Sequence, residues 1–157
     1  MKVICNTTPL ISLSSIGLFN LLYDIYGGIC IPEAVFEEVE RGGGIVVPKL
    51  GNIEWIKIIP DIRTYENSLL YQLDVGERQV ILNALQTPTD LLLIDDKIAR
   101  NIAEFFGLKV KGTLGVLVEA KKRNLISSFK RKALEIRDNG IYFSSRLIEE
   151  IAEQIDE

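Results

Sequence analysis

The sequence predicts an α/β protein with a mostly parallel sheet that is covered by helices on both faces. Short apolar segments of strand length alternate with segments of helical periodicity along most of the chain, which is typical of βαβ units. The 157 residues fit a single domain, and no repeat or long linker divides them. Apolar residues make up 47% of the chain and charged residues 25%, a balance that allows a buried core and a polar surface.

The expected strands are short and apolar, and they comprise residues 2–5, 29–31, 53–59, 91–94 and 108–110. Helices are expected at residues 7–22, with a break near Gly17, and at residues 32–40, 74–86, 97–106 and 114–122. A threonine hydroxyl is expected to cap the first helix, with Pro9 in its first turn. Residues 127–157 form an expected C-terminal helical extension (127–137 and 144–155), which should bury its apolar face and add no acid to a site.

The absence of histidine limits the chemistry that the chain can perform. It excludes Ser-His-Asp and Cys-His nucleophiles and histidine zinc sites. Cys5 and Cys30 form no Cys-x-x-Cys motif and lie in apolar segments, so we interpret them as buried small side chains. There is no signal-peptide pattern, and no apolar segment approaches the roughly 20 residues of a membrane span. We therefore expect a cytoplasmic protein without a membrane partner.

Charge is distributed unevenly along a chain whose net charge is −4. Residues 97–132 carry a local charge of +8, and the remainder carries −12. This asymmetry indicates either a basic face for a polyanion or a set of solvated helix faces, and charge alone does not decide between them.

Three polar residues follow expected strands, at the edge where sites form in parallel sheets. Asp95 and Asp96 come directly after residues 91–94. The pair suits a divalent cation, although one aspartate would also serve as the cap of the next helix. Asn6 follows the first strand and offers a neutral oxygen ligand. If the first and fourth strands are neighbours, Asn6 and the aspartates converge.

Two glutamates lie on the apolar faces of expected helices. Glu38 falls between Ala34 and Val35 on the apolar arc of its helix, and a carboxylate aimed at the core has to be paired or metal-bound. The alternative is that it lies at the margin of this arc and reaches water. Glu77 also lies on an apolar face, but Asp74 and Glu77 have the spacing of a capping box. Both interpretations of Glu77 stay open.

Five segments carry a resemblance to a known family. They are residues 6–11 (Asn-Thr-Thr-Pro-Leu-Ile), 31–39, 73–77, 92–96 and 112–117. In this order the segments resemble the PIN domain, a metal-dependent ribonuclease fold of many prokaryotic toxins, and in particular a mostly uncharacterised prokaryotic PIN-like branch. The resemblance extends from the amino terminus to about Ile126.

The resemblance implies a three-layer α/β/α sandwich and a cluster of acids that holds Mg²⁺ or Mn²⁺ over an RNA phosphodiester. By position, the implied metal ligands are Asn6, Glu38, Glu77, Asp95 and Asp96, and the four acids among them are the implied catalytic residues. Thr8 matches a supporting hydroxyl. Arg100, Lys109 and Lys111 follow the acids in the basic stretch and are candidates for holding the RNA backbone. A toxin-like role, an antitoxin partner and a homodimer are implied as well.

Asn6 is the departure from the family pattern, because the first acid of the family is usually an aspartate. The loss of one anion should weaken cation binding. Two functions therefore compete: a metal-dependent endoribonuclease, and a PIN-like domain with weakened or lost catalysis that acts as an RNA-binding or regulatory partner. A small phosphatase or nucleotide-binding protein is disfavoured, because there is no P-loop and no Gly-x-Gly-x-x-Gly motif.

Overall fold

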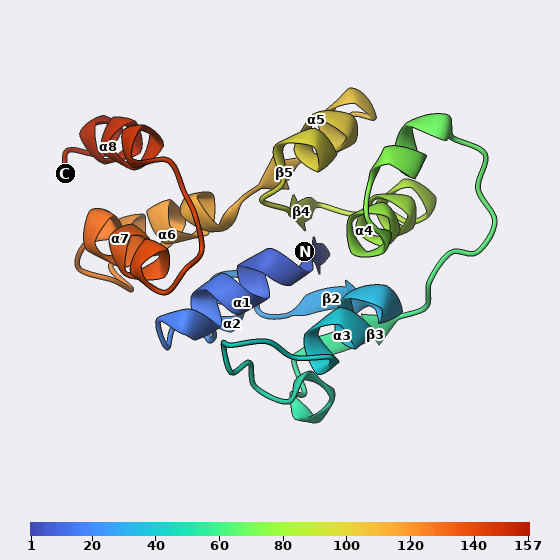
Figure 1. The fold of residues 1–157 in the computed structure, drawn as a ribbon, viewed down its shortest axis with the longest axis horizontal. Coiled ribbons are helices and arrows are strands. Elements are labelled where there is room, and N and C mark those ends of the chain that lie inside the picture. Colours follow the sequence, from blue (N-terminus) through green and yellow to red (C-terminus); the bar gives the residue numbers. More distant parts are fainter.

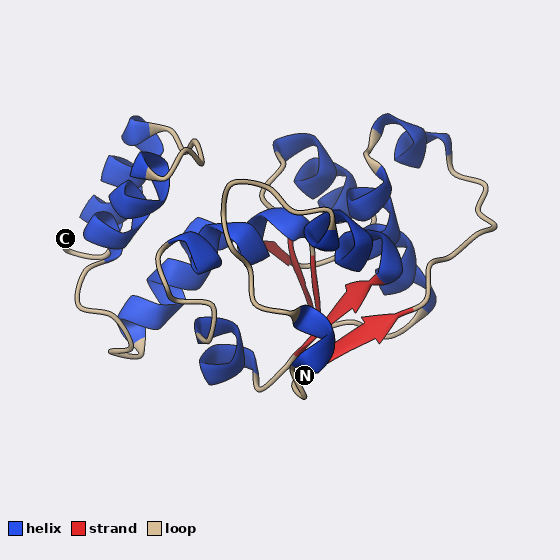
Figure 2. Cartoon of the chain, turned by 60° about the horizontal axis from the view of Figure 1, so that its bottom comes forward, coloured by secondary structure: helices blue, strands red, loops and turns tan.

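The computed structural model describes residues 1–157 and contains a five-stranded parallel sheet flanked by eight helices (Figures 1 and 2). The strands are β1 (Val3–Cys5), β2 (Ile29–Pro32), β3 (Ile56–Ile59), β4 (Leu91–Leu93) and β5 (Val110–Lys111). Their order in the sheet is β3-β2-β1-β4-β5, and every neighbouring pair is parallel. This is the three-layer α/β/α sandwich expected from the sequence.

The helices are α1 (Thr7–Ser15), α2 (Leu21–Tyr26), α3 (Glu33–Glu40), α4 (Val75–Gln86), α5 (Lys97–Phe105), α6 (Thr113–Lys122), α7 (Phe129–Asp138) and α8 (Ser145–Gln154). Two short 3₁₀ turns, η1 (Leu50–Asn52) and η2 (Ser68–Gln72), lie in the connections on either side of β3. Gly17 separates α1 from α2 with a φ of 69°, which a residue with a β-carbon rarely adopts. None of the helices combines the length and the hydropathy that a membrane span requires.

One hydrophobic core surrounds the sheet and contains 37 buried residues. The central strand β1 is buried along its whole length, as expected for a parallel sheet with helices on both faces. Cys5 lies in this strand and is a buried free thiol, and Cys30 in β2 is free and half-buried. Burial raises the pKa of Cys5 well above its ordinary value. The prediction that the cysteines are buried small side chains is confirmed for Cys5, whereas Cys30 is only half-buried.

Three local predictions were wrong in detail. The third strand begins at Ile56 rather than at residue 53, because η1 and the residues after it form the approach to the sheet. The fifth strand is Val110–Lys111 rather than residues 108–110, since its register is set by the pairing of Lys111 with Leu93 in β4. The N-cap of α1 is Asn6 rather than a threonine, and Asn6 makes no side-chain capping hydrogen bond.

The C-terminal residues 127–157 fold into α7 and α8, as predicted. Helix α7 packs against α6 and α1, and α8 packs against α7 (Figure 1). The buried side chains of the two helices are Phe129, Ala133, Ile136, Ile148 and Ala152. The Glu157 carboxylate closes this unit, because it accepts hydrogen bonds from the backbone N–H groups of Phe129 (2.7 Å) and Lys130 (3.1 Å) at the start of α7.

Candidate active site

The sheet order brings Asn6 and the two aspartates to the same edge. Strands β1 and β4 are neighbours, with Cys5 opposite Leu93, and the backbone N–H of Asn6 donates to the Leu93 carbonyl over 2.9 Å. Asn6 and the residues after β4 therefore leave adjacent carboxyl ends of the sheet. The sequence predicted that these residues converge if the first and fourth strands are neighbours, and the two strands are neighbours.

Asn6 and Glu38 face a common space that is kept open by Gly76. Asn6 is 5% exposed, and its Oδ1 is buried without a hydrogen-bond partner. A β-carbon on Gly76 would lie 3.1 Å from Asn6 Oδ1 and 3.1 Å from Glu38 Oε2. We call this arrangement of Asn6, Glu38 and Gly76 the oxygen cradle. Burying an amide oxygen without a hydrogen-bond partner costs free energy of folding. This cost indicates that the cradle is built for a ligand, such as a cation, that oxygen atoms can coordinate.

Glu38 is fixed in the cradle by a threonine. It is half-buried, and its Oε2 accepts a hydrogen bond from Thr7 Oγ1 over 2.7 Å. Glu38 therefore does not simply extend into water from the margin of its helix. Thr8, the hydroxyl that the resemblance selected, makes no such bond, because successive residues of a helix point about 100° apart. The hydroxyl that holds Glu38 is therefore that of Thr7. The resemblance matches Thr8 to a hydroxyl that supports the first acid, at position 6, and this role of Thr8 stays a prediction.

Glu77 caps its helix and also lies within electrostatic reach of the other acids. It forms a capping box with Asp74: Glu77 N–H donates to Asp74 Oδ1 (2.8 Å), and Asp74 N–H donates to Glu77 Oε2 (3.2 Å). Burial, and then the charges of Asp74, Asp96 and Glu38, raise the pKa of Glu77 from 4.5 to about 7. The two interpretations of Glu77 are thus compatible.

Asp95 and Asp96 have different environments. Asp96 is exposed and caps α5, since its Oδ1 accepts from the Ala99 N–H over 2.9 Å. Asp95 is held by Thr113, whose N–H and Oγ1 donate to Asp95 Oδ1 and Oδ2 over 2.6 Å each. Burial raises the pKa of Asp95, and the Thr113 hydrogen bonds and the charge of Arg100 oppose this rise. Thr113 was missed as a site residue, although it follows β5, the neighbour of β4.

The three basic residues predicted for RNA binding are dispersed. Arg100 lies beside Asp95, because a β-carbon on Gly112 would come near both the Asp95 Oδ1 and an Arg100 guanidinium nitrogen. Lys111 packs its stem under Gly115 and turns its charge toward Glu119, whose pKa it helps to lower. Lys109 is exposed and precedes β5, so it lies toward the other end of that strand. Only Arg100 is adjacent to the acids.

No three of the cysteine, aspartate and glutamate side chains are close enough together to hold a metal ion. The tight acidic cluster that the resemblance implies is therefore not formed by carboxylates alone. The residues of the cradle nevertheless fit a hard divalent cation, for which oxygen ligands are preferred. They provide one carboxylate, one unpartnered amide oxygen and a space that a β-carbon would fill, with Glu77 and Asp96 close enough to influence each other's charge.

A comparison with protein families assigns the chain to a family. A family model described as a PIN domain (DUF3368) matches residues 2–157. The chain therefore belongs to the PIN domain family, a nuclease-type fold whose members generally use divalent metal ions. The match includes residues 127–157, beyond the point where the sequence motifs end. No curated protein and no solved structure matches the chain.

Proposed function

We propose that the protein is a divalent-metal-dependent endoribonuclease that hydrolyses RNA phosphodiesters. The observation that carries this proposal is the oxygen cradle at the carboxyl edge of a PIN fold, with the buried Asn6 Oδ1 unpartnered and facing the space shared with Glu38. The basic stretch of residues 97–132, with its local charge of +8, supports a polyanionic substrate.

Asn6 and Glu38 would hold the cation, with Glu77 and Asp96 at the border of its site. A bound Mg²⁺ or Mn²⁺ supplies Lewis-acid polarisation of the phosphodiester and lowers the pKa of water. Glu77, with its pKa raised to about 7, is suited to accept a proton near neutral pH. Thr7 keeps the Glu38 carboxylate in position, and Thr113 does the same for Asp95. Arg100, which lies beside Asp95, would contact a phosphate oxygen.

A second function has an observation in its favour. Asn6 replaces an acid, and no three acidic side chains form a metal-holding group, so cation binding has to be weak relative to a full acidic cluster. A PIN domain with this site can act as an RNA-binding or regulatory partner without cleavage. A toxin-like role, an antitoxin partner and a homodimer stay predictions of the family resemblance.

Cleavage assays with two glutamine variants separate these functions. Single-stranded RNA is incubated with wild-type protein, Glu38→Gln and Glu37→Gln, with Mn²⁺ and with EDTA, at matched salt. Glu37 is the exposed neighbour of Glu38 on the same helix, so Glu37→Gln controls for the loss of one charge. We expect Mn²⁺-dependent cleavage by wild type and Glu37→Gln, and a loss of roughly 100-fold or more for Glu38→Gln. Equal cleavage by all three proteins would remove Glu38 from the mechanism. RNA binding without cleavage would favour the regulatory function.

A further inference from the structure

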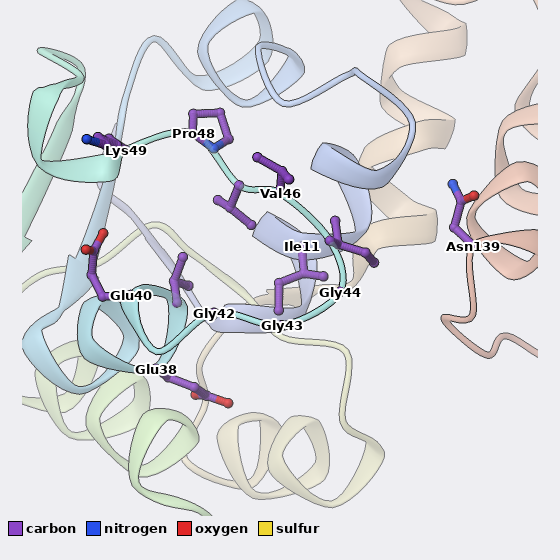
Figure 3. A pocket seen from close by; sticks show the side chains of 13 residues that line it. Ile11, Glu38, Glu40, Gly42, Gly43, Gly44, Val46, Pro48, Lys49 and Asn139 are labelled. Atoms are coloured by element: carbon purple, nitrogen blue, oxygen red, sulfur yellow. The ribbon is translucent and has the colours of Figure 1, made fainter.

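The largest cavity of the protein lies next to the oxygen cradle and is not used by the proposed hydrolysis. It has a volume of about 620 Å³, within the range of small-molecule sites. Its walls are α1, α3 and the connection of residues 42–49, and Asn139 from the C-terminal unit faces them across the space (Figure 3). Glu38 lines this cavity and also the smaller hollow that contains Gly76. The cavity therefore adjoins the site where a phosphate would be attacked.

The composition of the cavity wall indicates the kind of group that it can hold. Its apolar surfaces come from Ile11, Val39, Ile45, Val46 and Val47. The backbone groups of residues 43–48 make no hydrogen bond to the rest of the protein. An apolar surface beside free backbone donors and acceptors suits a nucleobase, which has apolar faces and a hydrogen-bonding edge.

The charges of the lining argue against an anion in the same space. The ionisable side chains that line the cavity are Glu38, Glu40 and Lys49, which together give a net negative charge. A phosphate would be repelled there, whereas a neutral base would not. Asn139 belongs to the far wall of the cavity, where its Nδ2 donates to the Ser15 carbonyl over 2.8 Å.

We infer that this cavity binds one unpaired nucleobase of the RNA, next to the nucleotide whose phosphate lies at the oxygen cradle. The inference rests on the proposed function, because it takes RNA to be the substrate. It makes the substrate single-stranded at this position, since a base in the cavity cannot be paired in a duplex. Residues 42–49 then select substrates by recognising a base, while the acids act on the backbone.

The inference is tested by NMR with ¹⁵N-labelled full-length protein, titrated with adenosine 5′-monophosphate and, separately, with ribose 5-phosphate, which lacks the base. We expect the nucleotide to shift the amide signals of residues 43–47 in a saturable manner, and ribose 5-phosphate to leave them unchanged. Equal shifts by the two compounds would mean that the phosphate alone is bound, and would overturn the inference.

Two variants and a control locate the binding. Ile11→Phe fills the cavity from α1, and Val46→Asp places a carboxylate at its rim; Val46 is 88% exposed, so this second variant does not disturb the core. Leu147→Asp, on the exposed side of α8, makes the same change in charge away from the cavity. We expect the affinity for the nucleotide to fall at least roughly tenfold in the two cavity variants and not in the control. Unchanged affinity in both would refute the assignment.

The same titration shows whether the cavity binds a peptide instead of a base, and it separates a failure of this inference from a failure of the proposed function. If a short valine-rich peptide shifts the signals of residues 43–47 and the nucleotide does not, the segment pairs with an extended chain and the inference is wrong. The NMR readout needs neither metal nor cleavage. Base binding by a protein that does not cleave RNA would therefore support the cavity assignment while the hydrolytic function fails.

Discussion

Replacement of Asn6 by aspartate should have opposite effects on stability without and with metal. The two facing oxygens, Asn6 Oδ1 and Glu38 Oε2, lie at most about 6 Å apart, because each is 3.1 Å from the β-carbon position of Gly76. Two carboxylates at this distance repel each other by about 3 kcal/mol at an effective dielectric constant of 20. In EDTA, Asn6→Asp should therefore lower the melting temperature by roughly 6–12 °C.

Bound Mn²⁺ should reverse this effect, because the added anion then faces a cation. We expect Asn6→Asp to tighten Mn²⁺ binding by at least roughly tenfold, and to raise RNA cleavage if the remaining acids are competent. The measurements are thermal melts in EDTA and in excess Mn²⁺, calorimetric titration with Mn²⁺, and RNA cleavage at matched salt. Asn101→Asp, an exposed change on α5, is the control and should alter none of them. Equal Mn²⁺ affinity in wild type and Asn6→Asp would show that position 6 is not a ligand.

Three further changes test other parts of the structure. Gly76→Ala should abolish Mn²⁺ binding by filling the cradle, while the melting temperature in EDTA stays close to wild type because alanine is favoured in a helix; unchanged calorimetric binding would contradict this. The pKa of Glu77 is raised to about 7, so its ionisation destabilises the fold as pH rises from about 4.5 to 7. Glu77→Gln keeps the capping acceptor. Its free energy of unfolding should equal that of wild type at pH 4.5 and exceed it by about 1 kcal/mol at pH 8, a value reduced for solvent screening because the side chain is half-exposed. Denaturant titrations at the two pH values measure this difference. Glu157→Gln should lower stability by about 1 kcal/mol at pH 7, as for a lost helix cap. Because the pKa of Glu157 is lowered despite its partial burial, by hydrogen bonds from Ser128, Phe129 and Lys130, this difference should vanish as the pH falls through that pKa. A constant difference from pH 7 to pH 3 would argue against a role for its charge.

The sequence by itself determined the architecture and the candidate acids. Apolar strands that alternate with amphipathic helices can be buried only in a parallel sheet covered on both faces, and local capping signals such as Asp74 and Asp96 fixed the starts of two helices. The position of Glu38 within an apolar arc indicated a carboxylate that is not freely solvated. These features depend on residues that are close in the sequence, so periodicity and spacing are sufficient to predict them.

Only the tertiary structure decided how these residues are used. That Thr7 rather than Thr8 holds Glu38, that Thr113 occupies both oxygens of Asp95, and that Gly76 leaves room beside Asn6 are contacts between segments far apart in the chain. Strand order and helix packing set these contacts. The cavity beside Glu38 has the same origin, since α1, α3, the connection of residues 42–49 and Asn139 form it only when they are folded together. Local sequence patterns supply the chemical groups, and long-range packing determines which of them face one another and which space remains open between them.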